Sequence, residues 1–377
     1  MHILIPVLHR PEKPTGVCRH GVNLAQGLAE RDEVSQVTVI IGRWQADYFA
    51  RSFDLGSPKI KLVEVDIKNS SISRNRWFLT GLPRLANAFE PDVVHLSFPF
   101  PVVRRWFRAP VVATIHDLYP YECPQNFGYP QVWVNQWFLR QCLGQSLALS
   151  CVSEVTLKAL KAYFPALAAQ KPLRVIYNSV ELAADPPTRP APRVVNLTGP
   201  FLLGVAQHRK NKNLDLLIRA YGQLSQQQRL KPGTQLLLVG SSGPETGALH
   251  RLVETLGLRG QVLFASGLSD GELRWLYEQA QLFVMPSSTE GFCLPLVEAQ
   301  TLGCPVVCSE IAIFREIASP RCRYFSLGGD PLGQLVAAID AALGQPGDRE
   351  PYINPAFLQA TVAQQYLDLY RLILGGG

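Results

Sequence analysis

Two carboxylates in the stretch TEGFCLPLVEA, residues 289–299, stand at a spacing that could hold one ligand between them. Glu290 precedes a predicted helix start and Glu298 lies about one turn inside that helix, because Pro295 suits a first turn. Backbone N–H groups at a helix N-terminus bind phosphate, and Gly291 allows a ligand close to the backbone. A ligand held here would carry phosphate in its middle and hydroxyl groups on both sides, one set for each carboxylate. This pattern predicts a nucleotide sugar. The alternative is a pair of acids that only stabilise the helix dipole.

Short apolar runs rich in valine, isoleucine and leucine recur along the chain, and segments with helical spacing follow them. The runs lie at residues 93–98, 111–117, 147–153, 173–178, 201–206, 235–240, 261–266, 281–287 and 305–310. Continuous apolar runs indicate parallel strands that helices cover on both faces. In the helical segment 270–280, Asp270 is the expected N-cap. The proline-rich segment 185–200 separates two similar series. The predicted fold class is therefore α/β, with two doubly wound domains facing each other across a ligand-binding cleft.

The chain length of 377 residues agrees with two domains. We place an N-terminal, acceptor-binding domain at residues 1–188 and a nucleotide-sugar-binding domain at residues 189–353. The segment 354–377 has the spacing of a long amphipathic helix, and we expect it to pack back on the first domain.

The composition of the chain indicates where the protein lies in the cell and whether it binds a metal. The chain is 47% hydrophobic and 18% charged, and none of its apolar runs reaches the roughly 18 residues that span a bilayer. The N-terminal apolar run is too short for a signal peptide and predicts a first buried strand, so we expect a cytoplasmic protein. The eight cysteines form no C-x-x-C pair and have no histidine at zinc-ligand spacing. We therefore expect them in the core and expect no bound metal.

The positive charge lies in the first half of the chain. Residues 1–180 carry 20 Lys and Arg against 13 Asp and Glu, a balance of +7, while residues 181–377 carry 16 against 17, a balance of −1. A basic half suggests an anionic partner such as a phospholipid surface, and its alternative meaning is a solvated surface. Nucleic acid is disfavoured, because no recognition helix or aromatic-rich sheet accompanies the basic residues.

The stretch TEGFCLPLVEAQTLGCPVV resembles the E-x7-E signature of glycosyltransferase family 4, which are retaining enzymes of the GT-B fold with two Rossmann-like domains. Further segments resemble this family, in the family's order, along most of the chain. They are PTGVCRHGVNLAQGLAE, EPDVVHLS, TIHDLYP, CVSEVTLKAL, VIYNSVEL, FLLGVAQHRKNKNLDLLIRAY and VLFASGLSDGELRWLYEQAQLFVMPSSTEGF.

For the second domain, the resemblance implies contacts along the whole donor. Glu298 would bind the ribose hydroxyls and Glu290 the transferred sugar. Gly267 matches the region near the base. Backbone N–H groups of four consecutive residues would hold sugar and phosphate oxygens, namely those of Gly291, Phe292, Cys293 and Leu294.

A basic pair in QHRKNKN resembles the family's diphosphate-binding cations. The pair is Arg209 and Lys212, and fixed cations there would stabilise the charge of a leaving nucleoside diphosphate. The sequence departs from the family pattern at Gln207, where an arginine is usual. Lys210 is therefore a competitor for the role of Arg209, and two exposed charges before a helix are the alternative.

The first domain contributes a histidine and a glycine to the implied site. His116, at the end of a predicted strand, matches the family histidine that contacts the donor sugar, and its alternative is a structural histidine. Gly16 resembles the glycine that lets the first loop approach the diphosphate, with Thr15 in place of a second family glycine. Asp117 is expected to cap its loop.

The implied reaction transfers a hexose, such as mannose, from a GDP- or UDP-sugar to an acceptor hydroxyl with retention of configuration. The resemblance implies no metal and no cofactor beyond the donor, with the departing phosphate helping to deprotonate the acceptor. One alternative is a sugar-nucleotide epimerase or a phosphorylase on a similar fold, which would need other acid/base groups or a lysine-bound pyridoxal phosphate. Another is a noncatalytic nucleotide-binding or membrane-binding scaffold, which would be expected to lack one of the implied residues.

The acceptor remains open, and one segment bears on it. Residues 98–110, FPFPVVRRWFRAP, interleave aromatic, aliphatic and arginine side chains, as in a segment that lies on an anionic membrane. Together with the basic first half, this favours a lipid-linked acceptor in cell-envelope glycan synthesis and a peripheral position on the inner face of the cell membrane. Residues 43–53 could add a second aromatic wall. The alternative for 98–110 is a partly buried connecting helix.

Overall fold

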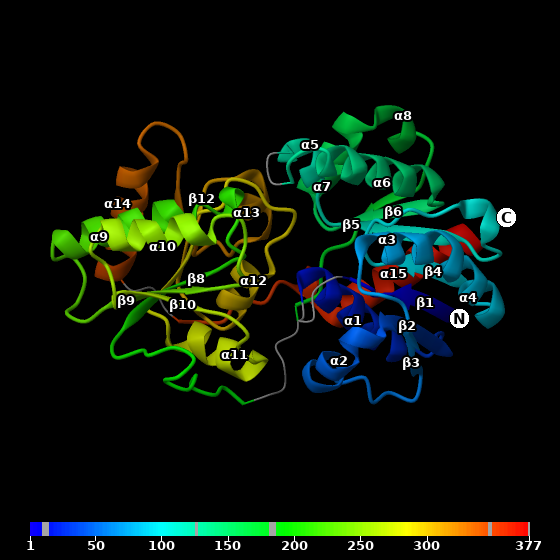
Figure 1. Ribbon diagram of the computed structural model, residues 1–377, viewed down its shortest axis with the longest axis horizontal. Helices are drawn as coiled ribbons and strands as arrows, with labels where there is room; N and C mark the ends of the chain where they lie inside the picture. Colours follow the sequence, from blue (N-terminus) through cyan, green and yellow to red (C-terminus); the bar gives the residue numbers. More distant parts are fainter. Residues whose placement is uncertain (10–14, 125–126, 181–185, 346–348, 376–377) are drawn as a thin grey trace. The chain divides into compact units, whose positions relative to one another are not determined.

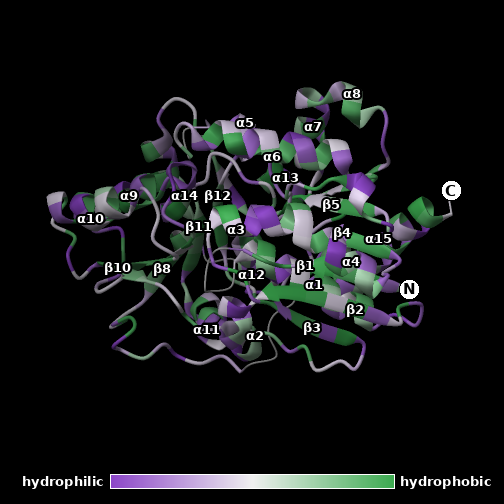
Figure 2. Ribbon diagram, turned by 45° about the vertical axis from the view of Figure 1, so that its right-hand side comes forward, coloured by the Kyte–Doolittle hydropathy of each residue, from purple (hydrophilic) through white to green (hydrophobic). Residues whose placement is uncertain are grey.

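A computed structural model describes residues 1–9, 15–124, 127–180, 186–345 and 349–375 of the chain. It divides into two compact units: unit 1 is Met1–Glu181 with Asn354–Gly377, and unit 2 is Leu182–Ile353 (Figure 1). Each unit is built on one parallel sheet with helices on both faces, which confirms the predicted α/β class. Figure 2 shows hydrophobic residues concentrated on the strands, as buried parallel sheets require.

The sheet of unit 1 has seven strands in the order β3-β2-β1-β4-β5-β6-β7. The strands are β1 (His2–Pro6), β2 (Gln36–Gly42), β3 (Ile60–Val65), β4 (Val93–Leu96), β5 (Val111–Ile115), β6 (Ala148–Cys151) and β7 (Leu173–Val175). The helices are α1 (Gly16–Ala29), α2 (Ala46–Ser52), α3 (Ser71–Arg76), α4 (Leu82–Phe89), α5 (Tyr119–Glu122), α6 (Gln131–Gln145), α7 (Glu154–Tyr163), α8 (Pro165–Ala168) and α15 (Gln359–Leu374). Short 3-10 or π turns are η1 (Arg43–Gln45), η2 (Trp77–Gly81), η3 (Arg104–Trp106) and η6 (Pro355–Phe357).

Each face of this sheet has its own core, because successive strand residues point to opposite faces. Ile3 packs with Val22 of α1 and Leu367 of α15 on one face. Leu4, the next residue of β1, packs on the other face with Leu143 of α6. Both faces of unit 1 are therefore covered.

A buried polar network joins α15 to three strands of unit 1. The Tyr370 hydroxyl lies 2.5 Å from His95 Nδ1, and His95 Nε2 lies 2.8 Å from Thr114 Oγ1. The Tyr366 hydroxyl is hydrogen-bonded to Thr114 Oγ1 at 2.9 Å and to Ser150 Oγ at 3.1 Å. Hydrogen-bonded polar groups in a core fix the position of a helix along the sheet as well as its burial. This network therefore sets where α15 packs on the strands.

The sheet of unit 2 has six strands in the order β10-β9-β8-β11-β12-β13. The strands are β8 (Phe201–Val205), β9 (Gln235–Val239), β10 (Val262–Ala265), β11 (Leu282–Met285), β12 (Val306–Ser309) and β13 (Arg323–Phe325). The helices are α9 (Leu214–Gln226), α10 (Thr246–Thr255), α11 (Asp270–Gln279), α12 (Leu294–Thr301), α13 (Ala312–Ile317) and α14 (Pro331–Gly344), with the 3-10 turn η5 (Lys210–Lys212) before α9.

The predicted strands are confirmed, and one predicted helix cap is wrong. Ser269, and not Asp270, is the N-cap of α11, and its hydroxyl accepts a hydrogen bond from the Glu272 N–H. Glu272 reciprocates to the Ser269 N–H, so a capping box outweighs the single acid. All eight cysteines are buried, as expected. Among the described residues, no helix is both long and apolar enough to cross a membrane.

Candidate active site

The strand order of unit 2 places two loops beside its topological switch point. Successive strands run outward from β8 in one direction and from β11 in the other, and β8 and β11 are neighbours. Ligands of doubly wound sheets bind outside the carboxyl ends of strands at such a point. The loops that follow these two strands are residues 206–213 and 286–293, and they hold most of the predicted donor-binding residues.

Backbone and amide hydrogen bonds join these two loops. Asn211 Nδ2 donates to the Thr289 carbonyl at 3.1 Å, and the Ser288 N–H donates to the Asn211 carbonyl at 2.8 Å. Asn213 Nδ2 donates to the Pro286 carbonyl at 2.9 Å. The asparagines of the NKN sequence thus fix the lysine between them relative to the second loop.

That lysine pairs with the first acid of the E-x7-E motif. Lys212 Nζ lies 2.6 Å from each carboxylate oxygen of Glu290, and the two side chains are only 16% and 6% exposed. Ser287 Oγ also donates to Glu290 Oε1 at 2.8 Å. Because a buried charge without a partner is costly, loss of either side chain would leave the other without its charged partner.

The helix that follows begins where the sequence predicted. Helix α12 starts at Leu294, with Pro295 as its second residue and Cys293 as its N-cap. Cys293 has φ 80° and ψ 72°, in the left-handed region that favours glycine. Such a residue stores strain of about 1–3 kcal/mol, and strain of this kind gathers at functional sites. The turn brings Gly291 and Phe292 to the start of the helix.

The second acid of the motif is held by a tyrosine from α11. The Tyr277 hydroxyl donates to Glu298 Oε2 at 2.9 Å, and the Tyr277 ring is buried. Burial, together with the charge of Glu298, raises the pKa of Tyr277 well above its usual value. Tyr277 therefore stays protonated and keeps its donor at any physiological pH.

The remaining predicted residues of unit 2 lie on its loops. Arg209 precedes η5, and among the described residues no carboxylate pairs with it. Lys210 is exposed, whereas Lys212 is mostly buried, which separates the two lysines by environment. Gly267 follows β10 with φ +72°, a conformation that glycine adopts without strain.

In unit 1, His116 follows β5 and is held in one tautomer. Its Nε2 lies 2.8 Å from the Ser97 carbonyl, which can only accept, so Nε2 carries the proton. Burial lowers the pKa of His116 to about 4, and its imidazole is neutral near pH 7. Nδ1 is then an acceptor suited to a hydroxyl group.

Aromatic rings surround His116 and restrict its orientation. The ring of His20 meets it edge to face at 4.8 Å between centroids, and Phe98 stacks beside it at 6.3 Å. Asp117 accepts from the Tyr119 N–H at 3.1 Å, so the expectation that it caps its loop is confirmed. Gly16 is the first residue of α1, and Thr15 is the N-cap whose hydroxyl accepts from the Cys18 N–H.

The segment 98–110 packs most of its apolar side chains into unit 1. Val102 and Phe107 are buried, and Phe100 stacks on Phe78 with 3.6 Å between ring centroids. Trp106, in η3, is 42% exposed. This segment therefore presents one large aromatic side chain to solvent.

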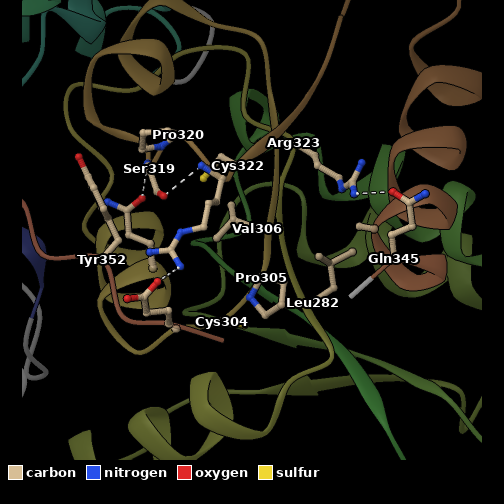
Figure 3. A pocket seen from close by; sticks show the side chains of 15 residues that line it. Leu282, Cys304, Pro305, Val306, Ser319, Pro320, Cys322, Arg323, Gln345 and Tyr352 are labelled. Carbon is tan, nitrogen blue, oxygen red and sulfur yellow. Dashed lines mark hydrogen bonds and ion pairs between the residues drawn. The ribbon is translucent and has the colours of Figure 1, made fainter. Parts of the chain in front are cut away.

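Figure 3 shows a separate hollow of about 370 Å³ in unit 2. Leu282, Val306 and Arg323, which are the first residues of β11, β12 and β13, line it. It therefore lies at the amino ends of these strands, opposite the loops that carry the E-x7-E acids. Nearby Arg321 is paired with Glu350 at 2.9 Å. This hollow is distinct from the candidate donor site.

The sequence did not single out Tyr277, Ser287 or His20 as site residues. Tyr277 belongs to the apolar stripe of its helix, where a tyrosine signals a core position, and its contact with Glu298 depends on how α11 and α12 pack. His20 and His116 lie 96 positions apart in the chain and meet only in the fold.

Two parallel α/β units, with paired acids and a lysine at the switch point of the second, are typical of GT-B glycosyltransferases. Residues 14–184 match the family model described as Glycosyltransferase Family 4, and residues 188–356 match the model described as Glycosyl transferases group 1. The two matches together cover most of the chain. The protein belongs to the family 4 glycosyltransferases, as its motif predicted.

Similar proteins match this chain over most of its length. The O-antigen chain mannosyltransferase B of Escherichia coli is 26% identical over 80% of this chain and 81% of its own. The O-antigen chain mannosyltransferase RfbU of Salmonella typhimurium is 24% identical over 82% of each chain. The crystal structure of Anabaena HepE with UDP and glucose has a TM-score of 0.68 and 17% identity, covering 98% of this chain and 99% of its own. These matches give no support to an epimerase, a phosphorylase or a noncatalytic scaffold.

Proposed function

We propose that the protein transfers mannose, with retention of configuration, from a GDP- or UDP-sugar to a hydroxyl of a lipid-linked precursor in cell-envelope glycan synthesis. The names of the two O-antigen mannosyltransferases support the sugar and the pathway class. The HepE complex with UDP and glucose supports a nucleotide sugar as donor. The observation that carries the proposal is the buried pair of Lys212 and Glu290 beside the start of α12.

This pair suits a ligand that carries both phosphate and hydroxyl groups. A diphosphate beside Lys212 binds part of the charge of the ammonium that Glu290 binds in the free protein. Sugar hydroxyls then donate hydrogen bonds to Glu290 and make up for this loss. Glu298 accepts from the ribose hydroxyls, with its carboxylate oriented by Tyr277. Sugar and phosphate oxygens accept from the N–H groups of four consecutive residues, Gly291, Phe292, Cys293 and Leu294. Gly267 lies near the base.

The proposed catalytic groups act on the leaving group and on the orientation of the sugar. Lys212 and Arg209 stabilise the negative charge that develops on the diphosphate as the anomeric C–O bond breaks. His116 accepts a hydrogen bond from a sugar hydroxyl at Nδ1, since its Nε2 proton is engaged by Ser97. The acceptor oxygen bonds to the anomeric carbon and its proton passes to a phosphate oxygen. Gly16 gives the diphosphate close access to the start of α1.

The test is a panel of GDP- and UDP-sugars incubated with the protein and a polyprenyl-linked glycan acceptor, with release of nucleoside diphosphate followed over time. We expect a mannose donor, GDP-mannose or UDP-mannose, to turn over faster than donors of other sugars. Turnover with none of the donors would overturn the proposal.

Two matched variants connect turnover to the site. Glu290→Gln keeps the shape of the side chain and removes the charge, so we expect turnover to fall by at least about 100-fold while nucleotide binding persists. Glu254→Gln, on the exposed face of α10, is the control and should stay within about twofold. Equal turnover in both variants would contradict the role of Glu290.

A further inference from the structure

The loop that follows β1 lies at the topological switch point of the unit 1 sheet. In that sheet β1 and β4 are neighbours, and successive strands run outward from β1 in one direction and from β4 in the other. Ligands of doubly wound sheets bind outside the carboxyl ends of the strands at such a point. His9 stands three residues after the end of β1, and its side chain is partly exposed. It is therefore placed where a ligand of unit 1 is expected.

The orientation of a buried amide beside this loop is fixed by its hydrogen bonds. The Gly42 N–H donates to Gln45 Oε1 at 2.9 Å, so the amide oxygen of Gln45 faces Gly42. The amide nitrogen, Nε2, then donates to the Val7 carbonyl at 3.0 Å and to the Tyr48 hydroxyl oxygen at 2.7 Å. The Tyr48 hydroxyl accepts from Gln45 and has its own proton left to donate to another group.

That proton goes to His9 and fixes the tautomer of its ring. The Tyr48 hydroxyl oxygen lies 3.1 Å from His9 Nε2, and its other neighbour, Cys18 Sγ at 3.6 Å, is only a weak acceptor. Burial, together with the charge of Arg74, lowers the pKa of His9 to about 4, so the ring is neutral near pH 7. A neutral imidazole that accepts at Nε2 carries its proton on Nδ1.

The N–H group at Nδ1 of His9 is buried, and among the residues that the structure describes none accepts a hydrogen bond from it. A buried donor without an acceptor costs free energy, and its presence in a native fold calls for an explanation. The indole Nε1 of Trp44 donates to the His9 carbonyl at 3.1 Å, and Trp44 is partly exposed. A sugar has apolar C–H faces and hydroxyl oxygens that accept hydrogen bonds, so an aromatic ring beside a free donor suits it.

We infer that His9 donates a hydrogen bond from Nδ1 to a hydroxyl oxygen of the acceptor sugar, beside the ring of Trp44. This inference rests on the proposed transfer reaction and adds to it a residue that selects the acceptor. Trp44 belongs to the segment 43–53, for which the sequence suggested a second aromatic wall. The donor is disfavoured as the partner of His9, because most of its proposed contacts lie on unit 2.

The experiment compares two amide variants of His9 in transfer to the polyprenyl-linked glycan acceptor, with acceptor and donor concentrations varied separately. His9→Asn carries an amide near the place of Nδ1 and can still donate there, but it is too short to accept from Tyr48. His9→Gln reaches the place of Nε2 and keeps the bond from Tyr48, but it has no donor near Nδ1. We expect the KM for the acceptor to rise at least about tenfold in His9→Gln and less than about threefold in His9→Asn.

The KM for the donor and the affinity for free nucleoside diphosphate, measured by calorimetry, should stay within about twofold of wild type in both variants. The control is His2→Gln, at the amino end of the same strand, where His2 Nε2 lies 2.8 Å from Thr38 Oγ1. It should leave both KM values within about twofold of wild type.

Three outcomes would overturn the inference. A purely structural role through Tyr48 would reverse the order of the two variants. A buried water as the only partner of Nδ1 would leave the KM for the acceptor unchanged in His9→Gln. A rise in the KM for the donor alone would assign His9 to the donor. Each of these outcomes leaves the transfer reaction in place, whereas a wild-type protein without turnover would overturn the proposed function and this inference with it.

Discussion

A single hydrogen bond from Tyr277 orients Glu298, the second acid of the E-x7-E motif. The carboxylate of Glu298 has two oxygens, and one accepts from the buried Tyr277 hydroxyl at 2.9 Å. A donor to a charged acceptor contributes roughly 1.5–3 kcal/mol and fixes which way the carboxylate faces. Tyr277 is therefore a positioning residue for the proposed ribose contact.

We predict that Tyr277→Phe raises the KM for the nucleotide sugar about tenfold and changes kcat by less than about threefold, because the ribose does not react. Steady-state kinetics on the purified variant would measure both. Tyr221→Phe is the control, since Tyr221 lies on another helix and donates to the Thr234 carbonyl at 2.7 Å. An unchanged KM, or an equal rise in both variants, would contradict the role.

Cys293 combines burial with a left-handed backbone, and this allows a test of strain. We predict that Cys293→Gly has a free energy of unfolding about 1 kcal/mol greater than Cys293→Ala, since both lose the thiol and only alanine keeps a Cβ at φ 80°. Urea unfolding would measure the difference. Elsewhere in a helix the order of glycine and alanine is reversed, so a more stable alanine variant would show that this turn is not strained.

The elements of unit 1 are joined by polar contacts as well as by apolar packing. Helix α15 is separated in sequence from the strands that it covers, yet Tyr366 and Tyr370 hydrogen-bond to side chains of β4, β5 and β6. Burial lowers the pKa of His95, at the centre of this network, to about 3. Neutral histidine is thus part of the folded state.

This predicts a loss of stability in acid. The folded-state pKa of His95 is below the unfolded value near 6.5, so stability is complete above pH 6.5 and declines as the pH falls toward about 3. We expect the change from pH 7 to pH 5 to cost about 2 kcal/mol through His95 alone. In His95→Asn that part of the decline should vanish. Urea unfolding of both proteins at the two pH values is the measurement, and equal declines would refute the assignment.

Parallel strands and their order of appearance could be predicted from the sequence, because continuous apolar runs directly reflect burial on both faces. Strands β2 and β3 were not predicted as separate elements, although β2 is buried over all but its first residue. Three of the six residues of β3 are exposed, so it lacks a continuous apolar run. The cap of α11 was misplaced by one residue because serine with a glutamate three positions later outweighs the acid between them.

The candidate site could be predicted only in part, because sequence motifs show short-range spacing and not contacts between distant positions. Glu290, Glu298 and Lys212 stand in motifs that short-range spacing makes visible. The contacts of Glu290 with Lys212 and of Glu298 with Tyr277 join positions 78 and 21 residues apart, which spacing does not encode. The direction of Lys212 depends on the two asparagines that fix its loop.

At the scale of the whole molecule, the order of the two units along the chain determines how often the chain passes between them. Unit 2 is inserted between the body of unit 1 and its last helix, so the chain passes between the units twice.

The family resemblance implied a chemistry that needs no metal, with Lys212 and Arg209 as the cations beside the diphosphate. We predict that an excess of EDTA leaves donor turnover within about twofold. Loss of activity that Mg²⁺ or Mn²⁺ restores would show that a metal holds the diphosphate instead.

The central claim is that Lys212, paired with Glu290, binds the donor diphosphate. The most direct measurement is calorimetric titration with GDP and with UDP. We expect the better nucleotide to bind at least about 30-fold more weakly to Lys212→Ala, and equally weakly to Lys212→Met/Glu290→Gln, which leaves no unpaired buried charge. Lys210→Ala, which removes the exposed neighbour, should bind within about twofold of wild type. Wild-type affinity in both Lys212 variants would contradict the claim.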